Sequence, residues 1–409
     1  MNIILFDDKT IRQNLLPLTF TRPVADIRTG ILTIAEKWKH FFKDNVSYLT
    51  QDYLQAKFPS KPGTENVYVN GAICPDVALV VKIRSLEPGK ALFKNKELIA
   101  FHADSYSFNK LSEFYSHTFE TAGEYPSDVH FVREVWHIFQ YNGQQIRSDF
   151  DFITTGLKSQ PITDPYTIVY NPENIYLEEG AEVKAAILNA SNGPIYLGKN
   201  AKVEEGAIIR GPFSLGEGSI VNMGGKMRGD NSIGPYCKVG GEISNSILFG
   251  YSSKGHDGFI GNSVIGEWCN LGADTNSSNM KNNYAEVKLW NYAKAGFKNT
   301  GLQFCGLVMG DHTKAGINTM FNTGTVTGVS ANIFGAGLPR NFIPSFSWGG
   351  SSGFETYQLR KALETAEKAM ERRGKVLTEV DKAILSKVFE LEREYRTWDR
   401  KQEIHISQN

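Results

Sequence analysis

The chain lacks the features that mark secreted, membrane-spanning and nucleic-acid-binding proteins. Its 409 residues contain no apolar run near the ~20 residues of a membrane span, and the first run, Ile3–Phe6, is too short for a signal sequence. Its four cysteines lie far apart without a C-x-x-C pair, which indicates a reduced protein with buried thiols. Its 44 basic and 44 acidic residues cancel, which gives no support for nucleic-acid binding. We therefore expect a cytoplasmic protein that binds neither nucleic acid nor a membrane.

What the sequence has instead is an apolar residue at every sixth position through its middle. Eight consecutive positions keep this period: Leu197, Val203, Ile209, Leu215, Val221, Met227, Ile233 and Val239. Six matches neither the 3.6-residue period of an α-helix nor the 2.0-residue period of a half-buried strand. It is typical of a hexapeptide β-helix, in which the stacking of neighbouring repeats buries a continuous core.

The six-residue period is interrupted twice. It loosens across residues 240–258, returns at Ile265 and Leu271, and is lost between residues 274 and 303. Because loops that leave a regular scaffold commonly carry binding groups, we interpret both interruptions as functional insertions. The alternative is that they are tolerated insertions without a role.

Residues 1–160 have the pattern of a mixed α/β domain. Strand candidates and one helical run alternate along it: strands at Ile3–Phe6, Val67–Val69, Ala78–Ile83 and Leu98–Phe101, and a helix at Leu32–Phe42. A polar loop follows the first strand, and open α/β sheets commonly bind ligands at such loops. Two prolines close together, Pro161 and Pro165, predict a domain boundary at about residue 160.

The C-terminal residues 346–409 change to a helical pattern. The first apolar stripe consists of Leu359, Leu363, Ala366 and Met370. The second consists of Ile384, Val388, Leu391, Tyr395 and Trp398. Thr378 followed by Asp381 forms a capping-box pattern between them. We expect an α-helical hairpin.

One N-terminal segment, PLTFTRP at residues 17–23, resembles the P-L-T-x-x-R-P segment of sugar-1-phosphate nucleotidyltransferases. In that family a glycine-rich loop precedes the segment and a lysine follows it, and both offset charge on the nucleotide phosphates. Here residues 6–12 contain no glycine, and Val24 occupies the lysine position. The resemblance implies Lys9, Arg12 and Arg22 as substitute nucleotide contacts.

The same resemblance implies a metal ligand at Asp76, which follows Asn70-Gly71 where the family has a metal-binding Gly-Asp. An active domain would then use Mg²⁺. The alternative is a remnant scaffold in which Arg22 and Asp26 form only a surface pair.

A second segment resembles the acetyltransferase part of the bifunctional N-acetylglucosamine-1-phosphate uridyltransferase/glucosamine-1-phosphate acetyltransferase family. Gly255-His256 is followed, at matching spacing, by Asn270 with the sequence Asn-Leu-Gly-Ala-Asp-Thr, and then by Asn279. The resemblance implies that His256 is a general base for an amine that attacks acetyl-coenzyme A, since an imidazole titrates near cellular pH. It also implies that Asn270 and Asn279 orient the sugar. A second histidine, His312, is interpreted as a corner residue of the β-helix.

This second resemblance has departures as well. Phe259 stands where the family has a tyrosine, and the basic residues that bind the sugar phosphate are missing upstream. Lys238 and Lys254 are the nearby substitutes. Gly337-Leu338-Pro339-Arg340 is similar to the ending of hexapeptide acyltransferases, which implies Arg340 as a coenzyme A contact, with a plain solenoid cap as the alternative.

Taken together, the sequence predicts a divergent member of this bifunctional family. We expect an α/β nucleotidyltransferase-like domain at residues 1–160, a β-helix at 161–345, left-handed by resemblance, and a helical segment at 346–409. The expected activity is acetyl-coenzyme A-dependent N-acetylation of an amino-sugar phosphate by a homotrimer. One alternative is nucleotidyl transfer from a nucleoside triphosphate onto a sugar-1-phosphate, with the β-helix serving assembly or regulation. Another is a non-catalytic, ligand-sensing scaffold.

Overall fold

The computed structural model describes residues 1–43, 46–104 and 106–399, and its contacts divide the chain into two compact units. Unit 1 comprises residues 1–27 and 32–134, and unit 2 comprises the short segment Arg28–Ile31 and the chain from Val135 onward. Helix α5 (Val135–Thr154) falls in unit 2, because it packs on β-strands of that unit. The domain boundary at about residue 160 stays a prediction.

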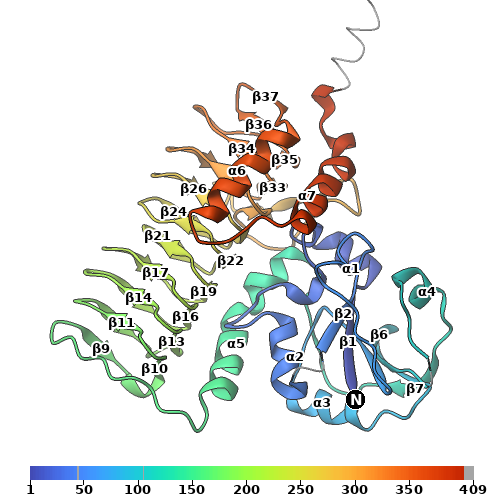
Figure 1. The fold of residues 1–409 in the computed structure, drawn as a ribbon. Coiled ribbons are helices and arrows are strands. Elements are labelled where there is room, and N and C mark those ends of the chain that lie inside the picture. The colour runs from blue at the N-terminus through green and yellow to red at the C-terminus, as the bar shows by residue number, and fades with distance from the viewer. Residues whose placement is uncertain (44–45, 105, 400–409) are drawn as a thin grey trace, which may run out of the picture. The chain divides into compact units, whose positions relative to one another are not determined.

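Unit 1 is built on a six-stranded sheet with the order β2-β1-β3-β6-β5-β7 (Figure 1). Its strands are β1 (Asn2–Phe6), β2 (Val46–Leu49), β3 (Asn66–Asn70), β5 (Lys90–Lys94), β6 (Glu97–His102) and β7 (Glu120–Glu124). Strand β1 pairs in parallel with both β2 and β3. It is a continuous apolar run because a central parallel strand is covered on both faces. This confirms the strands expected at Ile3–Phe6, Val67–Val69 and Leu98–Phe101.

Short helices surround this sheet. They are α1 (Lys9–Asn14), η1 (Leu18–Phe20), η2 (Val24–Asp26), α2 (Ile34–Phe42), α3 (Val77–Arg84) and α4 (Leu111–Ser116). A small antiparallel pair joins β4 (Ile73–Cys74) and β8 (His130–Phe131). Thr33 and Glu36 form a capping box at the start of α2, which confirms the predicted helix.

The strand expected at Ala78–Ile83 is wrong, because these residues form helix α3. Asp76 caps the helix by accepting a hydrogen bond from the Leu79 N–H at 2.8 Å. Leu79, Val80 and Ile83 are buried on one face, whereas Val77 and Val81 are 68% and 60% exposed. The β-branched composition favours a strand, but burial of a single helical face decides the structure.

Unit 2 is a parallel β-helix whose coils stack (Figure 1). Its first sheet holds β10 (Ile175–Leu177), β13 (Ile195–Leu197), β16 (Phe213–Leu215), β19 (Asn231–Ile233), β22 (Ile247–Gly250), β25 (Val264–Glu267), β30 (Val308–Met309), β33 (Val326–Thr327) and β35 (Phe342–Ile343). Its second holds β11 (Glu182–Val183), β14 (Lys202–Val203), β17 (Ile220–Val221), β20 (Lys238–Val239), β23 (Ser253–Lys254), β26 (Asn270–Leu271), β31 (Lys314–Ala315), β34 (Asn332–Ile333), β36 (Ser347–Gly350) and β37 (Gly353–Thr356). Its third holds β9 (Ile168–Tyr170), β12 (Ile187–Asn189), β15 (Ile208–Arg210), β18 (Lys226–Met227), β21 (Glu242–Ser244) and β24 (Phe259–Gly261). A separate pair, β27 (Asn276–Ser277) with β32 (Met320–Phe321), lies beside β24, and the turn η3 (Pro172–Asn174) precedes β10.

The core of the β-helix confirms the six-residue period. All eight of the consecutive periodic residues are at most 1% exposed and belong to one apolar cluster. Each pairs with its counterpart one coil away; Leu197, for example, pairs with Leu215, which pairs with Ile233. The parallel β-helix is therefore observed, while its left hand stays a prediction.

The first interruption of the period is a shortening of the coils, so its interpretation as an insertion is wrong. Leu215 pairs with Ile233, 18 residues further on, but Ile233 pairs with Leu248, only 15 residues further on. The second interruption is an insertion, since Ile265 pairs with Met309, 44 residues later. It contains the antiparallel hairpin of β28 (Lys288–Asn291) and β29 (Gly296–Asn299).

The C-terminal segment forms the expected helical hairpin. Helix α6 (Leu359–Glu371) contacts α7 (Glu379–Leu391), which is followed by η4 (Arg393–Tyr395). Thr378 and Asp381 form the predicted capping box of α7. All four cysteines are buried and free, as expected. In the part of the chain that the structure describes, no helix is long and apolar enough to cross a membrane.

Candidate functional site

A shortened corner of the β-helix opens the depression in which His256 lies. At the corner between the second and third sheets, most coils use four residues, as at 204–207, 222–225 and 272–275. Between β20 and β21 only Gly240 and Gly241 make the turn. Because two residues are missing there, the wall of the β-helix recedes, and Asn222 reaches past this coil to donate a hydrogen bond from Nδ2 to the Gly255 carbonyl at 2.7 Å.

The depression has a volume of about 660 Å³. It is lined by Glu204, Asn222, Met223, Gly241, Gly255, His256, Asp257, Ala273 and Asp274. These lining residues include three carboxylates and no lysine or arginine. The site thus favours a cationic group beside the imidazole and disfavours a phosphate.

The His256 side chain is exposed at this depression. Within residues 1–43, 46–104 and 106–399, no group donates to or accepts from its imidazole. Both ring nitrogens are therefore open to a ligand. The chain fixes the position of this side chain through its backbone, which lies in the turn between β23 and β24.

Lys254, predicted as a surface contact for a sugar phosphate, points into the β-helix instead and is 1% exposed. Its Nζ donates to the carbonyl oxygens of His256 and Asp257, each at 2.6 Å. Burial lowers the pKa of Lys254 to about 8, although Asp257 and Asp274 act in the opposite direction. In this conformation its ammonium is directed at the backbone of the turn, away from the open side of the depression.

The remaining predicted residues of the β-helix are divided between two places. Lys238 and Asn270 are exposed and lie in one outward-facing row of the second sheet, with Ser253 between them. Asn279 lies after β27, beyond the third sheet, where its Nδ2 donates to Asn262 Oδ1 at 2.8 Å. The structure therefore brings Lys238 and Asn270 to the sheet that leads into the His256 turn, but places Asn279 a full strand beyond that turn.

Arg340, predicted to contact coenzyme A, lies over two aromatic rings. Its guanidinium carbon is 5.3 Å from the ring centroids of both Phe354 and Trp398. Burial lowers its pKa. This packing against aromatic rings favours the alternative, in which Arg340 is part of a cap on the β-helix. The coenzyme A contact stays a prediction.

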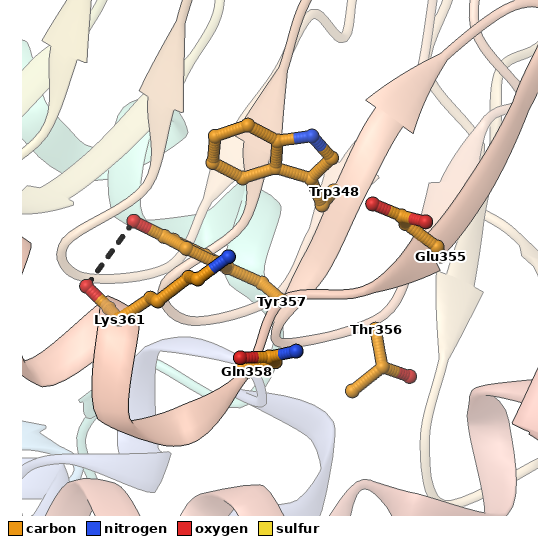
Figure 2. A pocket seen from close by; sticks show the side chains of 6 residues that line it. All are labelled: Trp348, Glu355, Thr356, Tyr357, Gln358 and Lys361. Atoms are coloured by element: carbon orange, nitrogen blue, oxygen red, sulfur yellow. Dashed lines mark hydrogen bonds between the residues drawn. The ribbon is translucent and has the colours of Figure 1, made fainter.

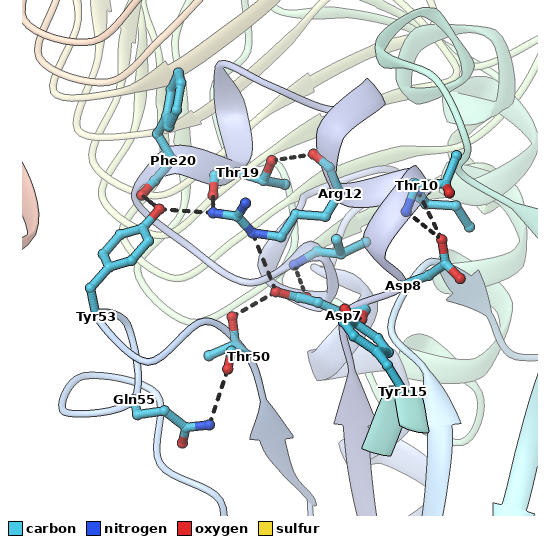
Figure 3. A network of polar contacts seen from close by, with 12 residues as sticks. Asp7, Asp8, Thr10, Arg12, Thr19, Phe20, Thr50, Tyr53, Gln55 and Tyr115 are labelled. Atoms are coloured by element: carbon cyan, nitrogen blue, oxygen red, sulfur yellow. Dashed lines mark hydrogen bonds and ion pairs between the residues drawn. The ribbon is translucent and has the colours of Figure 1, made fainter. Parts of the chain in front are cut away.

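In unit 1 the loop after β1 holds a buried polar network (Figure 3). The Asp7 carboxylate accepts hydrogen bonds from the Val24 N–H at 2.7 Å and the Thr50 hydroxyl at 2.6 Å. Burial raises the pKa of Asp7, against the opposing effect of Arg12 at 3.7 Å. Val24 occupies the position at which the sugar-1-phosphate nucleotidyltransferases carry a lysine. In this chain the backbone N–H of Val24 donates its hydrogen bond to the buried Asp7 carboxylate.

Arg12, predicted as a nucleotide contact, is part of the same network (Figure 3). One of its guanidinium nitrogens donates to the Thr19 carbonyl at 2.9 Å and to the Tyr53 hydroxyl at 2.8 Å. Arg12 is only 9% exposed, so its charge faces the protein rather than an open cleft.

The other predicted residues of unit 1 are spread out. Lys9 is exposed in the first turn of α1, and Arg22 is buried, with its side chain 3.6 Å from Asp26. Asp76, the predicted metal ligand, caps α3. Among the described residues, no group of three or more His, Cys, Asp or Glu side chains is placed to hold a metal ion. The described surroundings of Asp76 therefore do not fit a Mg²⁺ ion.

A second depression of about 450 Å³ lies at the last coil of the β-helix (Figure 2). Its lining is mixed, with two aromatic rings, one carboxylate and one ammonium: Trp348, Glu355, Thr356, Tyr357, Gln358 and Lys361. The Tyr357 hydroxyl is already paired with Thr365 at 2.6 Å. Nothing in the sequence singled out these residues.

Sequence reasoning also missed Glu204, Asn222 and Asp7. Asn222 and Glu204 precede the shortened corner by one and two coils, so only the stacking of coils brings them to His256. The one signal for this in the sequence is Gly240-Gly241, where the period of six breaks. Asp7 directly follows a buried strand, which is the place where a ligand-binding loop was expected.

Comparisons with known proteins find similarity over parts of the chain. Residues 3–158 match a family model described as sugar nucleotidyl transferase. The bifunctional protein GlmU of Methanocaldococcus jannaschii is 31% identical over 87 residues, which cover 21% of this chain and 21% of that protein. The chain thus spans about a fifth of the length of this relative.

Two solved structures share low similarity with the chain. The polySia-specific acetyltransferase NeuO is 14% identical with a TM-score of 0.27, over 48% of this chain and 85% of that one. An Arabidopsis UDP-N-acetylglucosamine acyltransferase is 17% identical with a TM-score of 0.23, over 58% and 82%.

The match likens residues 3–158, the segment that includes the sheet of unit 1, to sugar nucleotidyl transferases. In this chain the segment that matches the sugar nucleotidyl transferase model is followed by a parallel β-helix.

Proposed function

We propose that this protein is a transferase of sugar-nucleotide metabolism that N-acetylates an amino-sugar phosphate with acetyl-coenzyme A. The observation that carries the proposal is the exposed His256 imidazole in a depression formed by the shortened Gly240–Gly241 corner. The match of residues 3–158 to sugar nucleotidyl transferases supports a sugar phosphate as the substrate class.

The chemistry requires one proton acceptor. The neutral amine attacks the acetyl carbonyl, a C–N bond forms, the C–S bond breaks, and coenzyme A leaves as its thiol. His256 takes the proton that the amine loses and passes it to the departing sulfur, a role that suits an imidazole near neutral pH. A backbone N–H is the proposed donor to the oxyanion.

The charges around His256 orient the acceptor. Glu204, Asp257 and Asp274 attract the ammonium form of the amine and repel phosphate. We therefore propose that the amino end of the sugar enters the depression while its phosphate points outward, toward the row of Lys238 and Asn270. In this arrangement Asn270 orients the sugar by hydrogen bonding. Asn279 is a further proposed contact for the sugar, and Arg340 is the proposed contact for coenzyme A.

The first prediction tests His256. His256→Gln is expected to lower the rate of thiol release from acetyl-coenzyme A with amino-sugar phosphates by about 10²–10⁴-fold, because the general base is lost. His312→Gln is the matched control, since His312 lies at a different corner with φ of 61° and stacks on Trp268. An unchanged rate in His256→Gln removes His256 from the mechanism.

A second candidate function is nucleotidyl transfer onto a sugar-1-phosphate from UTP or dTTP with Mg²⁺, and the family match over residues 3–158 favours it. Lys9, Arg12, Arg22 and Asp76 would then serve the nucleotide and metal. The internal pairing of Arg12 and Asp7 speaks against it, because charges that neutralise each other do not stabilise phosphates. Pyrophosphate release by the full chain would establish this activity, and calorimetry without nucleotide binding would end it.

The third candidate, a ligand-sensing scaffold, is separated by the same two assays. If neither thiol release nor pyrophosphate release is detected with several sugars and nucleotides, the scaffold is favoured over either transferase.

A further inference from the structure

Lys254 occupies a place in the β-helix that neighbouring coils give to apolar side chains. Val221 pairs with Val239, and Val239 pairs with Lys254, so the three side chains share one inward-facing row. Lys254 is 1% exposed in this row. Burying an ammonium is costly unless it is fully hydrogen-bonded. A valine or leucine would continue the row without that cost.

The hydrogen bonds of Lys254 coincide with a departure from the regular corner. At three other corners, the carbonyl oxygen of the second corner residue accepts a hydrogen bond from a backbone N–H in the next coil. The donor is the third corner residue of that next coil. The pairs are Gly206 with Ala185 at 2.9 Å, Gly224 with Glu205 at 3.0 Å, and Asn318 with Ala273 at 2.8 Å. The corresponding donor for His256 is the N–H of Asp274.

At His256 this pattern shifts by one residue. The Asp274 N–H donates to the Asp257 carbonyl at 3.0 Å, not to the His256 carbonyl. Lys254 Nζ takes the vacated position and donates to the His256 carbonyl at 2.6 Å. Its second hydrogen bond, to Asp257, ties the same turn.

The backbone dihedrals show the same shift. The third corner residues Gly206, Gly224, Asp274 and Asn318 have φ of 74°, 69°, 58° and 55°. In the His256 turn the positive φ falls on the fourth residue, Gly258, at 119°. A Cβ there would lie 2.2 Å from the Thr275 carbonyl oxygen and 3.1 Å from Lys254 Nζ, so the absence of a side chain leaves room for the next coil and for the ammonium. The turn and the lysine thus fit each other.

We propose that Lys254 is a positioning residue for His256, which holds the irregular 255–258 turn through two carbonyl oxygens and so sets where the imidazole lies in the depression. The inference rests on the proposed function in so far as His256 is the base. It assigns to Lys254 a role different from the sugar-phosphate contact expected from the sequence.

The test compares Lys254→Met with a matched control, Lys314→Met. Methionine keeps the length of the side chain without donors. Lys314 is a half-buried lysine in the outward-facing row, where it pairs with Asn270; burial lowers its pKa to about 8 as well, but its Nζ donates to the Trp268 carbonyl at the opposite corner of the second sheet. The first readout is the NMR signal of the His256 ring in histidine-labelled full-length protein, assigned with His256→Gln.

Lys254→Met is expected to move the His256 ring signal and to lower kcat for acetyl transfer about 10–100-fold, because small misplacements of a catalytic group are costly. The KM for acetyl-coenzyme A should stay within about threefold, since the Lys254 side chain is buried inside the β-helix. Lys254→Arg should recover part of kcat. Lys314→Met should leave the His256 ring signal unchanged, because its Nζ contacts a different corner.

An unmoved His256 signal in folded Lys254→Met overturns the proposal, whatever its kcat. If Lys254→Met does not fold, Lys254→Gln, whose shorter amide cannot hold both carbonyls, enters the same comparison. If the wild type shows no acetyl transfer, the proposed function fails, but the NMR comparison still decides whether Lys254 positions His256.

Discussion

Glu392 shows how a single buried ionisable residue ties distant parts of unit 2 together. Its Oε2 accepts hydrogen bonds from the Ser345 N–H at 3.0 Å and the Tyr292 hydroxyl at 3.1 Å. The residue is 0% exposed, and burial raises its pKa to about 7, against the opposing effects of these donors and of Arg396. It therefore joins the end of the helical hairpin to the inserted β-hairpin and to the last coils.

The raised pKa of Glu392 predicts a pH-dependent stability. The folded state holds this proton up to about pH 7, whereas the unfolded chain releases it near the ordinary value of 4.5. Stability from this residue is thus present below pH 4.5 and is lost as the pH rises through 7, by at most about 3 kcal/mol. Glu392→Gln, which keeps the neutral form, should remove this loss in thermal unfolding at pH 5 and pH 8.

The control for Glu392, the C-cap residue of α7, is Glu390→Gln in the last turn of that helix. Glu390 is exposed and pairs with Lys387 at 3.0 Å, so its replacement should change stability by less than about 1 kcal/mol at both pH values. Equal pH dependence in Glu392→Gln and the wild type would contradict the assignment of the buried proton.

At the scale of elements, the length of one corner creates the candidate site. The turn of Gly240 and Gly241 is two residues shorter than its neighbours, and this shortening exposes His256 together with Asn222. Restoring a four-residue corner by inserting Asn and Gly between Gly240 and Gly241 should fill the depression. Acetyl transfer should fall at least about tenfold while the circular dichroism of the β-helix is kept.

The control for this insertion places the same two residues in the turn between β28 and β29. That hairpin leaves the coil, so the β-helix corners are unchanged. Full activity in both insertion variants would show that the short corner does not shape the site.

At the scale of the whole molecule, apolar side chains lie on the corner that carries His256. Met223 and Ile317 are 73% and 72% exposed at this corner. Met223 lines the depression, and Ile317 lies four coils further along the same corner. We propose that a second copy covers both residues in the homotrimer that the family resemblance implies.

A double variant, Met223→Glu with Ile317→Glu, should therefore dissociate the proposed trimer, because six carboxylates would be buried in its interfaces. Sedimentation should then give the mass of one 45.6 kDa chain. Leu338→Glu, an exposed apolar residue near the end of the β-helix, is the control and should leave the assembly unchanged. A wild type that sediments as a monomer would contradict the trimer itself.

The sequence by itself determined the repetitive architecture. A period of six places one side chain per strand inside the coils, so the core from Leu197 to Val239 follows from spacing alone. Capping patterns such as Thr378 with Asp381 are likewise local, and the helical hairpin was predictable for that reason. The β-branched run at Ala78–Ile83 was misread because only its packing against the sheet decides which face is buried.

The tertiary structure alone decided the candidate site. The sequence pattern identified His256, but the break before it was interpreted as an added loop. A missing pair of residues disturbs the six-residue period much as an insertion does. Lys254 was likewise interpreted as a surface cation, since no local pattern tells an inward from an outward lysine. Coil stacking settles both, because it fixes which residues face the core and which neighbours, up to two coils away, reach the same turn.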